Sequence, residues 1–168
     1  SMVNQSGADT DIEVCATMIG PDGAEVAKVA KDHLVHLGSQ ATVNIELAIA
    51  NPRLWSPDAP HLYTVRVILK QGGSVVDCYD TRCGIRSVRF DANKGFFLNG
   101  TNLKFRGVNE HHDAGCLGAA VPDDVVRRRF RILKEMGCNA IRVAHNPASP
   151  TFLDLCDEMG FMVVEDAF

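Results

Sequence analysis

The chain has 168 residues, of which 46% are hydrophobic and 23% are charged, and its formal net charge is -4 at pH 7. This composition is typical of a soluble globular protein that forms one domain, or one small domain and part of another. The acidic balance argues against nucleic-acid binding, because no basic surface is available for phosphates. No apolar run approaches the roughly 20 residues of a membrane-spanning helix, so no membrane association is expected.

The first residues, SMVNQSGADTD, are mostly polar, and we interpret residues 1–10 as a cloning tag followed by a polar lead-in. No apolar signal-peptide core follows, so the sequence does not assign a compartment. The six cysteines are scattered without C-x-x-C spacing. They are therefore expected to be structural thiols, and neither a metal site nor a disulfide framework is predicted.

In residues 11–92, apolar and polar residues mostly alternate with a period of two. The segments TVNIELAI (residues 42–49) and LYTVRVIL (residues 62–69) place apolar side chains mainly on one face, which is the pattern of half-buried strands. Segments 20–25 and 71–74 contain glycines and supply hairpin turns. Short strands separated by such turns predict a β-sandwich, without helices, for this part of the chain.

An irregular passage, Asn51–Tyr63, interrupts the strands. Its three prolines exclude a central strand, and it carries Trp55, the one tryptophan of the chain. One interpretation of Trp55 is a stacking platform for a sugar. The favoured interpretation is a loop pinned against the edge of the sandwich, because a large aromatic side chain most often contributes packing.

Residues 93–168 follow a different pattern. Asn99-Gly100 indicates a small hairpin. Strand patterns then alternate with amphipathic helical patterns. The order is strand 103–109, helix 122–137, strand 139–145, helix 149–160 and strand 161–168. This βαβαβ order predicts an α/β fold with a parallel sheet and right-handed crossovers.

Polar side chains gather at the predicted carboxyl ends of these strands, where the sites of parallel α/β folds form. They are Asn109, Glu110, His111, His112, Asp113, Arg142, His145, Asn146, Glu165 and Asp166. Arg142 is unexpected in an apolar strand, because a buried guanidinium needs a partner. It belongs either to an internal ion pair with Glu165 or Asp166, or to a functional rim. The adjacent histidines lack metal-ligand spacing, so no metal site is predicted.

Residues 139–164, NAIRVAHNPASPTFLDLCDEMGFMVV, resemble the first signature of glycoside hydrolase family 2, which includes β-galactosidases and β-glucuronidases. The matching positions include Asn139, Arg142, His145, Pro147, Asp157 and Gly160. Val143 and Asn146 depart from the signature, which usually has a small residue and a tyrosine there. The segments LWSPDAPHLY, GFFLNGTNLKFRGVN and HHD are similar to the family in the same order. The resemblance therefore covers about residues 41–168.

The resemblance implies a multi-domain chain. Residues 11–92 are expected to form an immunoglobulin-like β-sandwich, and residues 93–168 the N-terminal part of a (β/α)8 TIM barrel, truncated after its third strand. The implied partner is a carbohydrate substrate. The implied substrate-binding residues are Arg142, His145, Asn109, His111, Asp113 and Asp166. In some β-galactosidases the acidic pair after the third strand helps to hold magnesium, but here no cofactor is predicted.

The resemblance also implies a retaining exo-glycosidase that removes terminal β-linked sugars. In the family, the acid/base follows the fourth barrel strand and the nucleophile follows the seventh, so this chain is expected to lack both. Glu110 and Glu165 do not replace them. They follow strands one and three, roughly 9–10 Å apart, whereas a retaining pair needs about 5–5.5 Å. The chain alone is therefore predicted to be inactive.

Two further expectations follow from the residues. An unfinished barrel exposes an apolar inner face and a free strand edge, so the chain is expected to self-associate. The alternative to an enzyme fragment is a carbohydrate-binding or structural β-sandwich module without catalysis.

Overall fold

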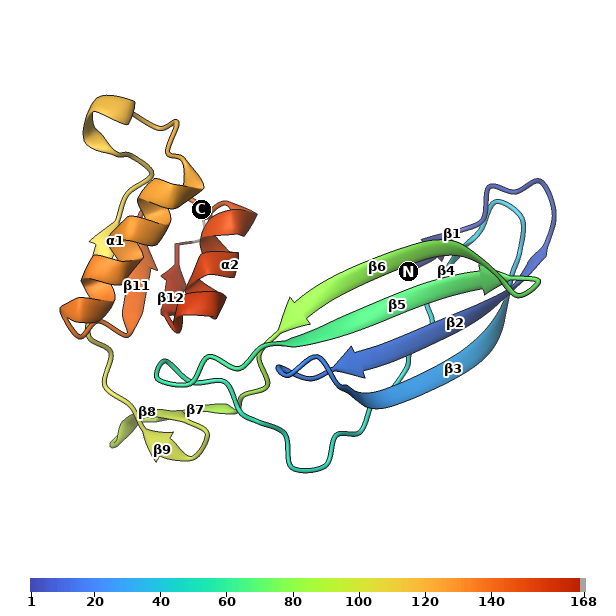
Figure 1. Cartoon of the computed structure of the whole chain (residues 1–168), viewed down its shortest axis with the longest axis horizontal. Helices are drawn as coiled ribbons and strands as arrows, with labels where there is room; N and C mark the ends of the chain where they lie inside the picture. The colour runs from blue at the N-terminus through green and yellow to red at the C-terminus, as the bar shows by residue number, and fades with distance from the viewer. Residues whose placement is uncertain (167–168) are drawn as a thin grey trace. The chain divides into compact units, whose positions relative to one another are not determined.

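The computed structural model describes residues 1–166, which form two compact units (Figure 1). The first unit comprises residues 1–52 and 62–83, and the second comprises residues 53–61 and the chain from Gly84 onward. The domain boundary between residues 92 and 93 stays a prediction, because compact units and domains need not coincide. No helix within the described residues is long and apolar enough to cross a membrane.

The first unit is built on an antiparallel sheet with the strand order β3-β2-β5-β6. Its strands are β2 (Thr10–Ile19), β3 (Glu25–Val35), β5 (Tyr63–Gln71) and β6 (Ser74–Cys83). Gly72 and Gly73 connect β5 to β6 with φ angles of 55° and 81°, as a two-residue hairpin turn requires. Both predicted turns, at 20–25 and 71–74, therefore lie where strands reverse.

A second, shorter layer covers part of this sheet. Strand β1 (Met2–Val3) pairs antiparallel with β4 (Gln40–Ala41). The core beneath it consists of Ile12, Val14 and Val35, packed by Met2, Ala41, Val43, Ile45, Val67 and Leu69. Apolar side chains of two layers thus meet in one core, as in a sandwich.

The segment 42–49 differs from its prediction as a paired strand. Its side chains alternate between half-buried and exposed, as the sequence pattern indicated. It nevertheless belongs to no ladder, because no residue among 1–166 forms backbone hydrogen bonds with it. The apolar pattern reports which face is buried, whereas pairing depends on a neighbouring strand.

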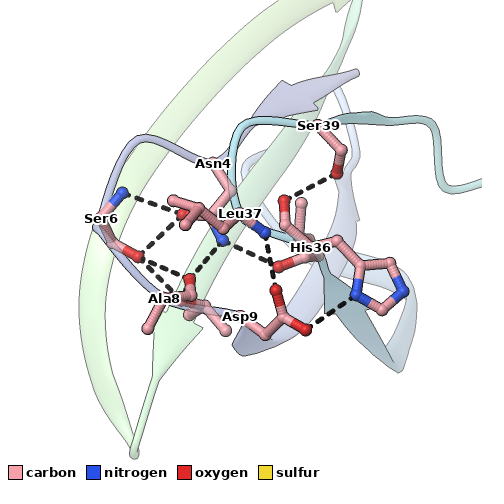
Figure 2. A network of polar contacts seen from close by, with 9 residues as sticks. Asn4, Ser6, Ala8, Asp9, His36, Leu37 and Ser39 are labelled. Carbon is pink, nitrogen blue, oxygen red and sulfur yellow. Dashed lines mark hydrogen bonds and ion pairs between the residues drawn. The ribbon is translucent and has the colours of Figure 1, made fainter.

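The predicted lead-in, residues 1–10, takes part in the first unit. Figure 2 shows its contacts with the turn that follows β3. The Asn4 side chain is buried and donates hydrogen bonds of 2.8 Å to the carbonyls of Ala8 and Val35. Asp9 accepts from the backbone N–H of Leu37 at 2.8 Å and lies 2.9 Å from Nδ1 of His36. Both contacts lower the pKa of the Asp9 carboxyl, the Leu37 bond most.

The second unit contains the predicted βαβαβ order. Strands β10 (Gly107–Glu110), β11 (Ala140–Val143) and β12 (Met162–Glu165) form a parallel sheet in that order. Helices α1 (Asp123–Glu135) and α2 (Pro150–Met159) connect them, with the short 3-10 helix η1 (Gly115–Leu117) before α1. The parallel sheet is confirmed. The last predicted strand extended to Ala167 and Phe168, which lie outside the described residues.

A small antiparallel sheet precedes β10. It consists of β7 (Val88–Asp91), β8 (Gly95–Leu98) and β9 (Thr101–Asn102). Asn99 and Gly100 have φ angles of 52° and 79° at the turn between β8 and β9. The hairpin predicted from the Asn-Gly pair is therefore confirmed.

Local sequence signals set the limits of α2, and apolar packing fixes it to the sheet. The Ser149 hydroxyl accepts the backbone N–H of Phe152 at 3.2 Å, and Gly160 ends the helix at φ 76°. The main core of the unit contains the buried residues Phe130, Leu133, Cys138, Ile141, Leu155, Cys156 and Phe161. Since Ile141 lies on β11 and Phe130 on α1, the helices cover one face of the sheet.

Trp55 lies in the second unit and is fully buried, with 0% exposure. Its indole N–H donates to the Asp157 carbonyl at 2.8 Å, and the Arg86 guanidinium lies 4.7 Å from the ring centroid. A Cβ on Gly84 would lie 2.8 Å from Trp55 atoms. The stacking platform is therefore excluded, because a sugar cannot reach the ring. The packing interpretation holds, and the ring packs among residues of the second unit, including Gly84 and Arg86.

Candidate functional site

The register of the parallel sheet sorts the strand-end residues onto two faces. Asn109, Arg142 and Val164 are aligned across the three strands, and Glu110, Val143 and Glu165 form the next row. Successive side chains along a strand point to opposite faces. Ile141 and Val163 pack with the helices. Arg142 and its row therefore lie on the face that the helices leave uncovered.

Asp166 contacts both Arg142 and His145. Its Oδ2 accepts a hydrogen bond from Nη2 of Arg142 at 2.6 Å, and Nδ1 of His145 lies 3.3 Å from the same oxygen. The Arg142 side chain is 42% exposed and that of His145 is 68% exposed. An ion pair this open contributes at most about 1 kcal/mol to stability, so stability alone does not account for it.

His111 extends this cluster toward the loop after β10. Its ring centroid lies 5.4 Å from that of His145, in an edge-to-face arrangement. Asn109 is exposed and neighbours Arg142 in the register, one strand away. We call Asn109, His111, Arg142, His145 and Asp166 the mouth cluster, since all lie at or after the carboxyl ends of parallel strands.

Asp113 is a predicted site residue outside the mouth cluster: within residues 1–166 no side-chain hydrogen bond or ion pair joins it to the cluster, and it lies beyond the strand register that aligns Asn109 with Arg142. It is exposed, its backbone N–H donates to the His111 carbonyl, and its own carbonyl accepts from Nη2 of Arg129. Arg129 also binds Oε2 of Glu110 at 3.1 Å. The loop after β10 is thus fastened to α1. Arg129 is a positioning residue that the sequence analysis did not single out.

Glu165 holds the loop after β11. Its Oε1 accepts the backbone N–H of Ala148 at 2.6 Å, which fixes the segment that carries His145 and Asn146. Glu110 and Glu165 therefore both position loops from the helix-covered face. Neither lies on the face of Arg142, which argues against their use as a catalytic pair on a sugar bound there.

The side chains of the mouth cluster offer both hydrogen-bond donors and acceptors. A guanidinium, two imidazoles, an amide and a carboxylate supply both donors and acceptors on one open face. Among residues 1–166, no three His, Cys, Asp or Glu side chains converge as ligands of a metal ion. The arrangement is thus a hydrogen-bonding rim at the C-terminal end of a parallel α/β sheet, which is where barrel enzymes bind substrate.

Comparison with known proteins identifies the family to which the chain belongs. The model of the glycosyl hydrolases family 2 TIM barrel domain matches residues 90–168, and a second model, described as glycosyl hydrolases family 2, matches residues 1–86. The chain belongs to glycosyl hydrolases family 2. The immunoglobulin-like sandwich followed by the start of a TIM barrel is thereby confirmed.

Relatives and solved structures agree with this assignment. The chain is 43% identical over 168 residues to the β-galactosidase BoGH2A of Bacteroides ovatus, covering 100% of this chain and 20% of that protein. It is 32% identical over 162 residues to a β-glucuronidase of Bacteroides fragilis, covering 95% and 23%. A crystal structure of a family 2 member from Bacteroides cellulosilyticus superposes with a TM-score of 0.94 at 33% identity, covering 98% of this chain and 23% of that one. The chain spans about a fifth of the length of these relatives.

Proposed function

We propose that the mouth cluster forms one side of the sugar-binding mouth of a retaining exo-glycosidase that hydrolyses terminal β-linked sugars in the full-length protein. The observation that carries this proposal is the convergence of Arg142 and His145 on one carboxylate oxygen of Asp166. This convergence places donors and an acceptor on the uncovered face of a family 2 barrel sheet. The β-galactosidase with which the chain shares 43% identity favours a galactoside-type substrate.

Each member of the mouth cluster has a role in this proposal. Asp166 orients Arg142 and His145 and keeps one carboxylate oxygen for a sugar hydroxyl. Arg142 and His145 donate to sugar oxygens in charge-assisted or neutral hydrogen bonds. Asn109 and His111 complete the rim from the first strand. Asp113 reaches the sugar from an exposed loop position, as the weakest of the proposed contacts.

The 168-residue chain by itself is proposed to lack turnover. Retaining hydrolysis needs two carboxyl groups about 5–5.5 Å apart on either side of the glycosidic bond. Glu110 and Glu165 are occupied by Arg129 and the Ala148 N–H on the helix-covered face. The chain should release no nitrophenol from nitrophenyl galactoside, glucuronide or mannoside. Turnover that Glu165→Gln abolishes would contradict this.

The test of the sugar-binding role uses the full-length protein. Asp166→Asn keeps the shape of the side chain but removes the charge that holds Arg142 and His145. Misplacing such groups is expected to lower kcat/KM on the best nitrophenyl glycoside roughly 10- to 100-fold. His112→Ala is the matched control, because His112 neighbours His111, but among residues 1–166 no hydrogen bond, ion pair or ring contact joins it to the mouth cluster. Equal kcat/KM values for Asp166→Asn and the wild type would contradict the proposal.

We also propose that the isolated chain self-associates. Phe105 and Val164 are 38% and 45% exposed, and Val164 lies on the uncovered face of the parallel sheet. Exposed apolar surface beside a free strand edge favours association. Light scattering is expected to give a mass above that of a monomer, and Val164→Lys is expected to lower it. A monomer that binds no dye for apolar surface would contradict the proposal.

A further inference from the structure

The side-chain amide of Asn99 joins separate segments of the second unit. Its Nδ2 donates to the Trp55 carbonyl at 3.0 Å, and its Oδ1 accepts the backbone N–H of Ser87 at 3.0 Å. The Asn99 backbone N–H also donates to the Ser87 carbonyl at 2.9 Å. Asn99 is half-buried at the turn between β8 and β9 (Figure 1). Its amide therefore ties this hairpin to the loop 53–61 and to the segment before β7.

The residue after Asn99 has an accessible backbone nitrogen. Asn99-Gly100 is the one Asn-Gly pair of the chain. Gly100 is exposed, and a Cβ added to it would have no neighbour within 4 Å. Among residues 1–166, no backbone carbonyl accepts the Gly100 N–H. Because glycine has no side chain, its nitrogen can approach a neighbouring carbon closely.

An asparagine followed by glycine loses ammonia without an enzyme or cofactor, and asparagine is accordingly a thermolabile residue. The Gly100 nitrogen attacks Cγ of Asn99, and the new N–C bond closes a five-membered succinimide. The Cγ–Nδ2 bond breaks, and Nδ2 leaves as ammonia with the proton of the Gly100 N–H. Water then opens the ring at either carbonyl, which leaves aspartate or isoaspartate at position 99.

The folded hairpin opposes this ring closure. Asn99 and Gly100 both have positive φ, as in the type I′ turn of a two-residue hairpin. In that turn the Asn99 Cβ and the Gly100 nitrogen are not eclipsed about the bond between them, whereas the five-membered ring requires it. The turn must therefore open, and the amide must leave Trp55 and Ser87. Two neutral hydrogen bonds reduce the open population roughly 10- to 100-fold.

We propose that Asn99 is a site of spontaneous deamidation, that it reacts when the loop 53–61 releases its amide, and that the product keeps this loop released. In the product a carboxylate oxygen replaces Nδ2, which lies 3.0 Å from the Trp55 carbonyl oxygen. Carboxylates only accept hydrogen bonds, so repulsion replaces the bond. A reversible opening of the second unit thus becomes permanent. This inference is independent of the glycosidase proposal.

The experiment follows Asn99 in the 168-residue chain at pH 8, folded in buffer and unfolded in urea. Trypsin releases residues 95–104, and mass spectrometry measures the conversion of the Asn99 amide to an acid. Asn102 in the same peptide is the internal control, because the side chain of Leu103 hinders its ring closure. Trp55→Phe weakens the attachment of the loop, since it removes the bond to Asp157. Leu54→Ala is its control, because Leu54 is exposed in the same loop.

Asn99 is expected to convert roughly 10- to 100-fold faster in the unfolded chain than in the folded one. In folded Trp55→Phe it should convert roughly 2- to 10-fold faster than in the wild type or Leu54→Ala, because one hydrogen bond of the loop is lost. Equal rates in the folded and unfolded chains, or no conversion in the unfolded chain, would overturn the proposal. Equal rates in Trp55→Phe and the wild type would also overturn it, since the loop would then not control the site.

Asn99→Asp reproduces one product and tests the released state. Trp55 is the one tryptophan of the chain, so fluorescence reports its surroundings directly. Emission at longer wavelength and quenching by iodide are expected, with circular dichroism as the check that the chain stays folded. Asn93→Asp is the matched control, because it adds the same charge at an exposed turn position. Trp55 emission identical in Asn99→Asp and the wild type would overturn the proposed release.

Discussion

Trp55 gives the sharpest test of how the second unit is held together. The ring is fully buried, and its N–H is satisfied by the Asp157 carbonyl in the last turns of α2. The backbone N–H of Trp55 donates to the Ile85 carbonyl at 2.8 Å, and Nδ2 of Asn99 donates to the Trp55 carbonyl at 3.0 Å. The loop 53–61 is thus fastened to three segments far apart in the sequence.

Two substitutions separate the contributions of the ring and the N–H. Trp55→Phe keeps most of the packing but removes the hydrogen bond from the indole N–H to the Asp157 carbonyl, which costs about 0.5–1.5 kcal/mol of unfolding free energy. Trp55→Ala also removes the ring from a closed site, which costs about 3–5 kcal/mol. For a domain of roughly 60–100 residues, each kcal/mol lowers Tm by about 4–8 °C.

The assay is urea unfolding followed by circular dichroism at 222 nm. Helices α1 and α2 both belong to the second unit, so the helical signal reports that unit. Leu54→Ala is the matched control, because Leu54 is the neighbouring residue and is 41% exposed, and it should change stability by less than about 0.5 kcal/mol. A loss below about 1 kcal/mol in Trp55→Ala would refute the packing account.

Three further outcomes are expected. Gly160→Ala should destabilise the second unit by about 2 kcal/mol more than Gly137→Ala. Both glycines have positive φ, but only a Cβ on Gly160 would collide with the Pro57 carbonyl oxygen. Equal losses of stability in urea unfolding would contradict this contact. Iodoacetamide at pH 8 should modify the exposed Cys78 and Cys116 and spare Cys156, because burial raises the pKa of the Cys156 thiol to about 12. Labelling of Cys156 in the folded chain, detected by mass spectrometry, would contradict its burial. This pKa is higher in the folded chain than the ordinary value of 9.0, so folding stability should fall as the pH rises from about 9 toward about 12. Cys156→Ala should reduce this dependence of the unfolding free energy on pH. An unchanged dependence would show that other groups cause the loss of stability.

Local signals made much of the second unit predictable from sequence. Ser149 and Gly160 mark the ends of α2, and the Asn99-Gly100 pair marks a hairpin, because each acts through its own backbone. The pairing of strands by backbone hydrogen bonds was less predictable. The alternation of residues 42–49 identified their buried face, but hydrogen bonding requires a second strand, and none is present beside them within residues 1–166.

The candidate site was predicted in composition but not in its division between two faces. The sequence placed Glu110 and Glu165 on the same rim as Arg142, because all three lie near the carboxyl ends of the strands. The register puts these carboxylates in the row of Val143, on the helix-covered face. Their partners, Arg129 and the Ala148 N–H, come from helix and loop segments whose positions depend on tertiary packing. The place of Trp55 in the second unit depended on the same long-range packing.

The most direct test of the mouth cluster is a crystal structure of the full-length protein with its best 2-deoxy-2-fluoro glycoside trapped on the enzyme. The measured quantity is the distance from the side chains of Arg142, His145 and Asp166 to the oxygens of the trapped sugar. The proposed role predicts hydrogen bonds of about 2.7–3.2 Å from at least one of these side chains, with Asp166 still bridging the other two. A trapped sugar that none of the three side chains contacts, or an Arg142 that faces the helices, would contradict it.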